Sequence, residues 1–490
     1  MNFHLISYRT LLFLLMCLLL TTASCRGKDN PVDKDTDPDP AGPSASVWLT
    51  RGDKTALLSP QGTLRIITAG NSVWPVIKID STVRFQSVDG YGAALTGSSA
   101  WLLHKKMNSA DRQKLLVSLF DPINGIGISY LRLTMGASDF SLSDFTYSDL
   151  PQGETDEELN GFSLSRDLEE VVPVLSEILA VNNELEIMGS PWSAPAWMKT
   201  NGSLKGGKLK PEHYDVYAQY FVKYVEAMQS QGVTINAVTP QNEPLYFTAG
   251  YPCMEMQPQE QLEFIKNHLG PAFEQAGIST KIIVYDHNWD NTDYAISILN
   301  DPMARHYIAG SAFHAYGGNV SAMTTVRNAH PDKGLYFTEI SGGQWAVDFA
   351  ANLMWYMSNI FIGTAQNWSK SALMWNLVLD QNHGPRNNGC QDCRGVVTLN
   401  TVTGEVTFNE EYYAIGHFSK FIRPGAERIS LMQPQALPDL GAVCFENTDG
   451  SKVLVVANYG NDMRTFSVQQ GNKQFSYSIT AKSVATIQWN

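Results

Sequence analysis

Charged residues are scarce in this chain. They make up 17% of its 490 residues, below the share of about 25% that is usual in soluble proteins. Positive charge is the scarcer sign, because 35 Lys and Arg stand against 48 Asp and Glu and the formal net charge is −13. A phosphate backbone would be repelled by that charge. The composition therefore excludes nucleic acid as the expected partner, and the low charge excludes a disordered chain or a coiled coil.

Long apolar runs are also missing after the N-terminus. The run "LLFLLMCLLL" at 11–20 follows Arg9 and is too short for a transmembrane helix. It ends in "TTASC", which resembles the signal of a bacterial lipoprotein whose cysteine is lipidated. We predict a signal peptide over 1–25, lipidation of Cys25, and export to the cell envelope. The anchor is expected in the outer membrane, with the protein on either the periplasmic or the cell-surface side. A plain secretory signal cut near Ser24 is the alternative.

Residues that could be buried are almost absent from 26–46, which is rich in Pro and Asp. Such a segment cannot bury enough apolar surface to fold. We predict a disordered tether there, between the membrane and the folded body.

Cysteine is sparse, with six residues in all, two of them within the predicted signal peptide. Cys390 and Cys393 form "CQDC". In an exported chain this spacing favours a short disulfide over a zinc site or a cytosolic redox pair. Cys253 and Cys444 are distant in sequence, and we predict no bond between them.

Apolar strands alternate with amphipathic, helix-length segments from 83 to 410. The eight strand candidates are 85–95, 128–135, 185–192, 235–243, 281–289, 311–316, 334–340 and 372–379. Eight such repeats predict a (β/α)₈ barrel. A doubly wound open sheet is the alternative, but no glycine-rich phosphate loop follows the first strand. Further strands at 47–82 and 411–490 predict a β-sandwich beside the barrel.

Polar and aromatic residues gather where the predicted strands end, which is the functional rim of such a barrel. They are Asp139, Trp192, Asn242, Glu243, Asp286, His287, Trp289, His314, Tyr316, Glu339, Trp375 and Asn376. Each alone could be a capped loop or a satisfied core group. Their concentration at one rim predicts a pocket.

Glu243 and Glu339 follow strands four and seven. Two carboxylates across a pocket fit glycoside hydrolysis, in which one protonates the leaving oxygen and the other attacks or activates water. Their proximity should raise the pKa of the acid while its partner stays ionised. A metallohydrolase using Asp286, His287 and His314 is the competing interpretation, but it lacks the close spacing of a helix-borne zinc site. We expect no cofactor and no metal.

Five stretches carry a family resemblance: "SPWSAPAWMKTNGSLKGG" (190–207), "YAQYFVKYVEAM" (217–228), "VTPQNEP" (238–244), "YFTEISGG" (336–343) and "MWNLVLDQNHGP" (374–385). In this order they resemble glycoside hydrolase family 30, which contains glucosylceramidases, endo-β-1,6-glucanases and xylan-active enzymes. The resemblance implies a retaining enzyme with a (β/α)₈ barrel and a side β-sandwich.

The resemblance also implies roles for individual residues. Glu243 matches the general acid/base, Glu339 the nucleophile, and Asn242 the residue that hydrogen-bonds the sugar 2-hydroxyl. The other positions that match substrate-binding residues are Arg132, Asp139, Trp192, Tyr251, His314 and Trp375.

The segment 379–398, with its paired cysteines and "RGVVT", resembles the β-1,6-glucanase branch of that family. We therefore expect β-1,6-glucan as substrate and a monomeric enzyme. A β-glucosidase or glucosylceramidase-like activity is the alternative within the family. The non-enzyme alternative is an inactive glycan-binding lipoprotein, although such a protein would be free to lose a carboxylate and both are present.

Overall fold

The computed structural model describes residues 42–490. The predicted signal peptide, Cys25 and the predicted tether up to residue 41 lie outside the described residues. The strand β1 (Ser44–Arg51) begins three residues before the predicted first strand. Its side chains alternate between buried and half-buried positions, as expected for a strand with one face on a core.

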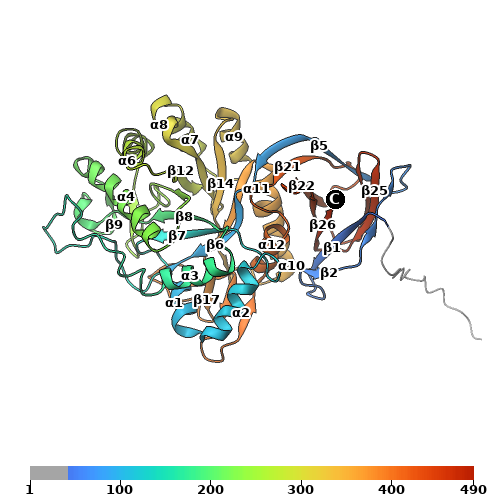
Figure 1. The fold of residues 1–490 in the computed structure, drawn as a ribbon, viewed down its shortest axis with the longest axis horizontal. Coiled ribbons are helices and arrows are strands. Elements are labelled where there is room, and N and C mark those ends of the chain that lie inside the picture. The colour runs from blue at the N-terminus through green and yellow to red at the C-terminus, as the bar shows by residue number, and fades with distance from the viewer. Residues whose placement is uncertain (1–41) are drawn as a thin grey trace, which may run out of the picture. The chain divides into compact units, whose positions relative to one another are not determined.

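Eight parallel strands close into a barrel, as predicted (Figure 1). In chain order they are β6 (Gly90–Leu95), β7 (Tyr130–Met135), β8 (Glu186–Pro191), β10 (Ala237–Val238), β12 (Lys281–Asn288), β13 (Ile308–His314), β14 (Gly334–Glu339) and β16 (Ser369–Met374). Each overlaps one of the eight predicted strands. All eight therefore direct their C-terminal ends to one rim, and the loops after them can share one site.

Helices cover the outside of the barrel (Figure 1). The main ones are α2 (Ser109–Phe120), α3 (Val171–Val181), α4 (Tyr214–Ser230), α5 (Pro258–Phe264), α6 (Gly270–Ala276), α7 (Thr292–Leu299), α8 (Pro302–Tyr307), α9 (Ser321–Ala329), α10 (Phe349–Trp355) and α12 (Glu410–Ser419). The aromatic stripe of α4 is core, since Tyr217, Tyr220 and Tyr224 are fully buried. Across the described residues, every helix is too short or too polar to span a bilayer.

Eleven further strands form one sheet in the order β2-β1-β26-β23-β22-β21-β5-β24-β25-β4, with β3 paired to β1. The longer members are β5 (Val76–Ser87), β21 (Glu427–Met432), β22 (Leu440–Glu446), β23 (Lys452–Asn458), β24 (Arg464–Gln470), β25 (Lys473–Ile479) and β26 (Ser483–Trp489); the short ones are β2 (Ser59–Pro60), β3 (Leu64–Arg65) and β4 (Ile67–Thr68). Residues from both ends of the sheet enclose one core, which confirms the predicted sandwich.

The sandwich packs against the barrel through a strand that is buried on both faces. In β23, Leu454 and Val456 belong to the sandwich core, whereas Val453 and Val455 belong to the barrel core. N- and C-terminal segments thus build the second layer together, because β1 and β26 pair over six residues.

His417 on α12 lies at this seam and is fully buried. The Thr486 hydroxyl donates to the carbonyl oxygen of His417 at 2.9 Å and therefore accepts from its Nδ1. The Thr50 hydroxyl then donates to Nε2 at 2.8 Å. Burial lowers the pKa of His417 to about 3, so the imidazole is neutral in the folded state.

This neutral histidine makes a prediction for stability. Because its pKa is lower in the folded than in the unfolded chain, protonation favours unfolding as pH falls below the unfolded value. From about pH 7.5 to about pH 5 this group alone removes about 2 kcal/mol from the free energy of unfolding. Denaturant unfolding measures the free energy of unfolding at both pH values. The decrease between them should be smaller in His417→Gln than in the wild type, because glutamine keeps a hydrogen-bond donor and an acceptor but does not titrate. An equal loss in variant and wild type would contradict the assignment.

Candidate active site

The chain leaves β10 after Val238 and enters the site in a tightly held conformation. Glu243 has a φ of 42°, in the left-handed region that non-glycine residues rarely adopt. Its N–H donates to the carbonyl oxygen of Asp286 at 3.0 Å, and its carbonyl oxygen accepts from the N–H of Tyr246 at 2.9 Å. Neighbouring backbone therefore fixes the direction of the Glu243 side chain.

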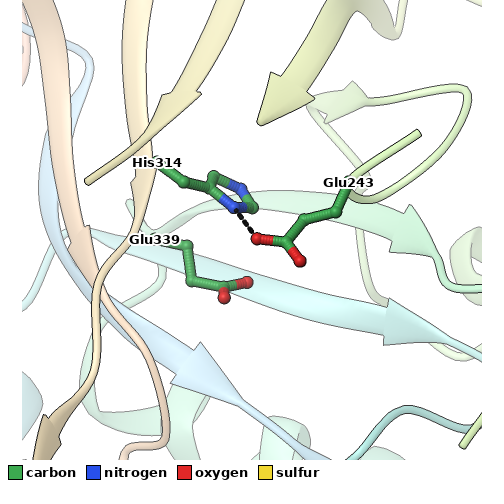
Figure 2. Close-up of side chains that lie close together, drawn as sticks. All are labelled: Glu243, His314 and Glu339. Carbon is green, nitrogen blue, oxygen red and sulfur yellow. Dashed lines mark hydrogen bonds and ion pairs between the residues drawn. The ribbon is translucent and has the colours of Figure 1, made fainter. Parts of the chain in front are cut away.

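The two predicted catalytic carboxylates meet at the barrel mouth. Glu243 and Glu339 each place an oxygen within 4.8 Å of the other and of a ring nitrogen of His314. Figure 2 shows both carboxyl groups directed into the same space. Retaining glycosidases hold their two carboxyl groups about 5–5.5 Å apart, whereas inverting ones leave about 6.5–9.5 Å for a water molecule. The separation here fits the retaining arrangement.

His314, the last residue of β13, lies beside Glu243 (Figure 2). Its Nδ1 is 3.0 Å from Glu243 Oε1, and its Nε2 is 3.1 Å from Asp286 Oδ1. Burial opposes a charge on the ring, but Glu339 and the hydrogen bonds to Asp286 and Glu243 raise the pKa of His314 to about 9. A proton is therefore held next to Glu243.

Asp286 is the centre of a buried ionic network. It is fully buried, and its carboxylate meets the donors Arg132 Nη2 (2.8 Å), Ser190 Oγ (2.7 Å), Thr239 Oγ1 (2.8 Å), Thr338 Oγ1 (2.7 Å) and His314 Nε2 (3.1 Å). Burial opposes its ionisation, but the charge of Arg132 and the hydrogen bonds hold the pKa of Asp286 well below its usual range. Asp286 is therefore a permanent anion.

Arg132 connects Asp286 to the predicted nucleophile, Glu339, because it donates to both carboxylates. Its Nη2 also donates to Asn242 Oδ1 at 2.7 Å, and its Nη1 donates to Glu339 Oε2. The Tyr316 hydroxyl donates to the other oxygen, Glu339 Oε1, at 3.0 Å. Each oxygen of Glu339 thus has a fixed donor, which sets the orientation of the carboxylate.

The electrostatics differ from the sequence-based expectation that the acid has the raised pKa. Burial raises the pKa of Glu339, and the charges of Glu243 and Asp286 add to that rise against His314 and Arg132. Burial also opposes ionisation of Glu243, but the hydrogen bond and charge of His314 lower its pKa. In the free enzyme the proton shared between His314 and Glu243 therefore lies on His314, and Glu243 is ionised.

A cavity of about 650 Å³ opens above these groups. Seven of the nine predicted site residues line it: Asp139, Trp192, Asn242, Glu243, Tyr251, Glu339 and Trp375. Arg132 and His314 do not line it, because both are fully buried beneath the carboxylates. They act on the site through Glu243 and Glu339.

Two indoles form one wall of the cavity. The rings of Trp192 and Trp375 stack with centroids 5.1 Å apart and an angle of 20° between their planes. The guanidinium carbon of Arg132 lies 5.1 Å from the first centroid and 5.5 Å from the second. This cation–π contact holds both rings and helps to keep Arg132 charged.

The loop after β16 forms another wall. Cys390 and Cys393 are joined by a disulfide, and both line the cavity. Gly389 packs directly on Asp139, since a Cβ added at Gly389 would lie 2.8 Å from Cβ of Asp139. Burial, and then the charges of Glu339 and Glu243, raise the pKa of Asp139 well above its usual range. Cys253 and Cys444 are free and buried, as expected.

Several lining residues were missed by the sequence reasoning. They are Tyr246, Thr248, Asn288, Ser341, Trp345, Asn388 and Gly389. Trp345 follows Glu339 by six residues in "ISGGQW". A tryptophan so close in sequence to the predicted nucleophile could have been predicted to line the pocket. Most of the others come from loops whose path depends on contacts distant in sequence.

Among the described residues, one group could place metal-ligating atoms close together, namely Glu243, His314 and Glu339. The Arg132 guanidinium donates to the same Glu339 and would repel a cation there. Two of the three ligands of the competing metal site are held by other bonds, because His314 contacts carboxylates with both ring nitrogens and Asp286 faces five donors.

Comparison with known proteins agrees with this geometry. Endo-1,6-beta-D-glucanase BGN16.3 of Trichoderma harzianum is 34% identical over 442 residues, covering 85% of this chain and 87% of that protein. Lysosomal acid glucosylceramidase of Mus musculus is 30% identical over 441 residues, covering 83% and 82%. The solved structure of the endo-beta1,6-glucanase BT3312 matches with a TM-score of 0.85 at 35% identity, over 91% of this chain and 99% of that one.

Two domain families match in the same order as the two layers of the fold. Residues 88–422 match the Glycosyl hydrolase family 30 TIM-barrel domain, and residues 425–487 match the Glycosyl hydrolase family 30 beta sandwich domain. The barrel match contains the carboxylate pair, its buried network and both indoles. The chain therefore belongs to glycosyl hydrolase family 30.

Proposed function

We propose that this chain is a retaining endo-β-1,6-glucanase that uses Glu243 as acid/base and Glu339 as nucleophile. The observation that carries the proposal is the approach of the two carboxylates to within 4.8 Å at the floor of an open cavity. The relatives named above as endo-1,6-beta-glucanases support the linkage.

In the first step, Glu339 attacks the anomeric carbon, and the bond to the leaving oxygen breaks as Glu243 protonates that oxygen. Arg132 and Tyr316 orient the attacking carboxylate, because each donates to one of its oxygens. The proton reaches Glu243 from His314, which lies 3.0 Å from its Oε1. The product of this step is a glycosyl-enzyme and a shortened glucan.

In the second step, Glu243 takes a proton from water, and the water oxygen displaces Glu339 from the anomeric carbon. Two inversions give retention of configuration. Glu243 can then pass this proton back to Nδ1 of His314. Nε2 of His314 stays hydrogen-bonded to Asp286 throughout. Apart from the glucan and this water molecule, no group outside this chain is needed to balance either step.

We further propose that the enzyme acts as a monomer, tethered to the cell envelope by a lipid on Cys25. The support is the sequence of 11–25 and the Pro- and Asp-rich segment that follows it.

Hydrolysis of a panel of β-1,3-, β-1,4- and β-1,6-linked glucans tests the substrate. We expect short β-1,6-linked oligosaccharides from the β-1,6 polymer, and products that keep the β-anomer when observed by NMR before mutarotation. Preference for glucosylceramide, the substrate class of the mouse relative's name, would overturn the linkage but not the mechanism. Products of inverted configuration would overturn the mechanism.

Replacing the carboxylates separates their roles. Glu339→Gln should lose roughly three to five orders of magnitude in kcat while still binding glucan, because the nucleophile is gone. Glu243→Ala should regain turnover of an activated aryl glucoside when azide is added, since that leaving group needs no proton. Glu263→Gln, at an exposed carboxylate on α5, is the matched control and should leave kcat unchanged. Full activity in Glu339→Gln would remove Glu339 from the mechanism.

The lipid anchor is tested by Cys25→Ala in a bacterial host fed radiolabelled palmitate. We expect the variant to lose the label and to leave the membrane fraction. Cys17→Ala, within the apolar run, is the matched control and should keep the label. Labelling that persists in Cys25→Ala would contradict the anchor.

A further inference from the structure

A second cavity opens directly beside the catalytic one. Its volume is about 680 Å³, and its walls come from the loops after β13 and β14 and from α10. It shares Tyr316, Ser341 and Trp345 with the catalytic cavity. The two cavities are therefore continuous along one side of the barrel mouth.

Exposed apolar side chains line this second cavity. Trp345 is 57% exposed, Val347 67% and Trp355 40%. Its polar side chains already make bonds within the fold: Asp348 accepts from the N–H of Ala351 at 2.7 Å through one oxygen, and Asn352 donates to Glu410. What the cavity offers a ligand is thus aromatic and aliphatic surface rather than hydrogen-bonding groups.

Trp345 is built into the boundary between the two cavities. Its indole lies directly on the backbone of Gly343, where an added Cβ would clash with the ring. The next residue back, Gly342, has no room for a Cβ either, because the Glu411 carboxylate occupies that space. The missing side chain at Gly343 therefore leaves the space that the Trp345 ring occupies, and the indole stays exposed.

The second cavity lies on the side of the barrel away from Asp139. In the barrel order β10-β12-β13-β14-β16-β6-β7-β8, β13 is diametrically opposite β7, the strand that precedes Asp139. At the Asp139 side the backbone of Gly389 packs directly on Asp139. A chain held at the carboxylates can therefore continue past Tyr316 and Trp345.

We propose that the second cavity binds the glucosyl units on the leaving-group side of the cleaved bond, with Trp345 and Trp355 as stacking surfaces. The inference rests on the proposed function and adds a second binding region to it. Since all hydroxyls of β-glucose are equatorial, both faces of its ring carry C–H groups that pack on an indole. The ring edges keep their hydroxyls in water.

The exposure of the lining favours a sugar over an alkyl chain. An alkyl chain gains most when apolar surface surrounds it and removes it from water. Here the indoles of Trp345 and Trp355 are 57% and 40% exposed, so a ligand that lies on them keeps contact with water. A pyranose ring needs one covered face and wet edges, which this cavity provides.

Trp355 lines only the second cavity, so Trp355→Ala is the informative variant. The measurement is kcat/KM for a long β-1,6-linked gluco-oligosaccharide divided by kcat/KM for an aryl β-glucoside. We expect this ratio to fall about threefold to tenfold, the size of one aromatic contact. Trp355→Phe should restore part of the loss, and an unchanged melting temperature would show that the fold is intact.

Trp74→Ala is the matched control, because Trp74 is a 48% exposed indole on the sandwich side and should leave the ratio unchanged. An unchanged ratio in Trp355→Ala, or an equal fall for both substrates, would overturn the proposal. A selective loss on octyl β-glucoside would assign the cavity to an alkyl chain instead. If the wild type prefers another linkage, the proposed β-1,6 specificity is wrong, but the cavity proposal is still open to test. The same ratio is then measured with oligosaccharides of the preferred linkage.

Discussion

The active site depends on one buried anion. Asp286 has no exposed surface, and an isolated carboxylate in that position would be strongly unfavourable. Arg132 and His314 compensate its charge, and each then contacts one catalytic carboxylate, Glu339 and Glu243 respectively. Arg132 and His314, which pair with Asp286 in the barrel interior, therefore determine the spacing of Glu243 and Glu339. Contacts at the open rim do not determine it.

Backbone strain accompanies this arrangement. Glu243, Tyr285, Asp286 and Asn376 all have positive φ. Tyr285 and Asp286 lie in the second half of β12, and Glu243 and Asn376 lie in the loops after β10 and β16. Such conformations cost of order 1–3 kcal/mol each and persist where surrounding structure over-determines them. At Asp286 the pairing of β12 with β13 shifts register between Tyr285 and His287, which turns the carboxylate into the barrel. The barrel ladder on either side holds the strained residues in place.

The sequence predicted the barrel and the carboxylate pair because both follow from local pattern. Apolar strands alternate with helices, and catalytic groups follow strands. The role of Asp286 did not follow, because a one-residue register shift decides whether it faces inward. The sequence offered Asp286 only as a residue at the rim and as a ligand of the less favoured metal site. The proton on His314 did not follow either, since it depends on contacts with residues 28 and 71 positions away. The second cavity depends on the turn at Gly342 and Gly343, which no strand pattern reveals.

The sandwich also reaches the site, through α12. One end of this helix carries His417, which is bonded to Thr50 and Thr486 of the sandwich. The other end carries Glu410 and Glu411, which accept from Arg394 at 2.5 and 2.8 Å. Arg394 adjoins the disulfide loop that lines the catalytic cavity, and Glu411 fills the space beside Gly342 below Trp345. Because one rigid helix joins these contacts, a shift of the sandwich would displace both the disulfide wall and the indole between the two cavities. The second domain is thus part of what shapes the substrate path, although none of its residues lines either cavity.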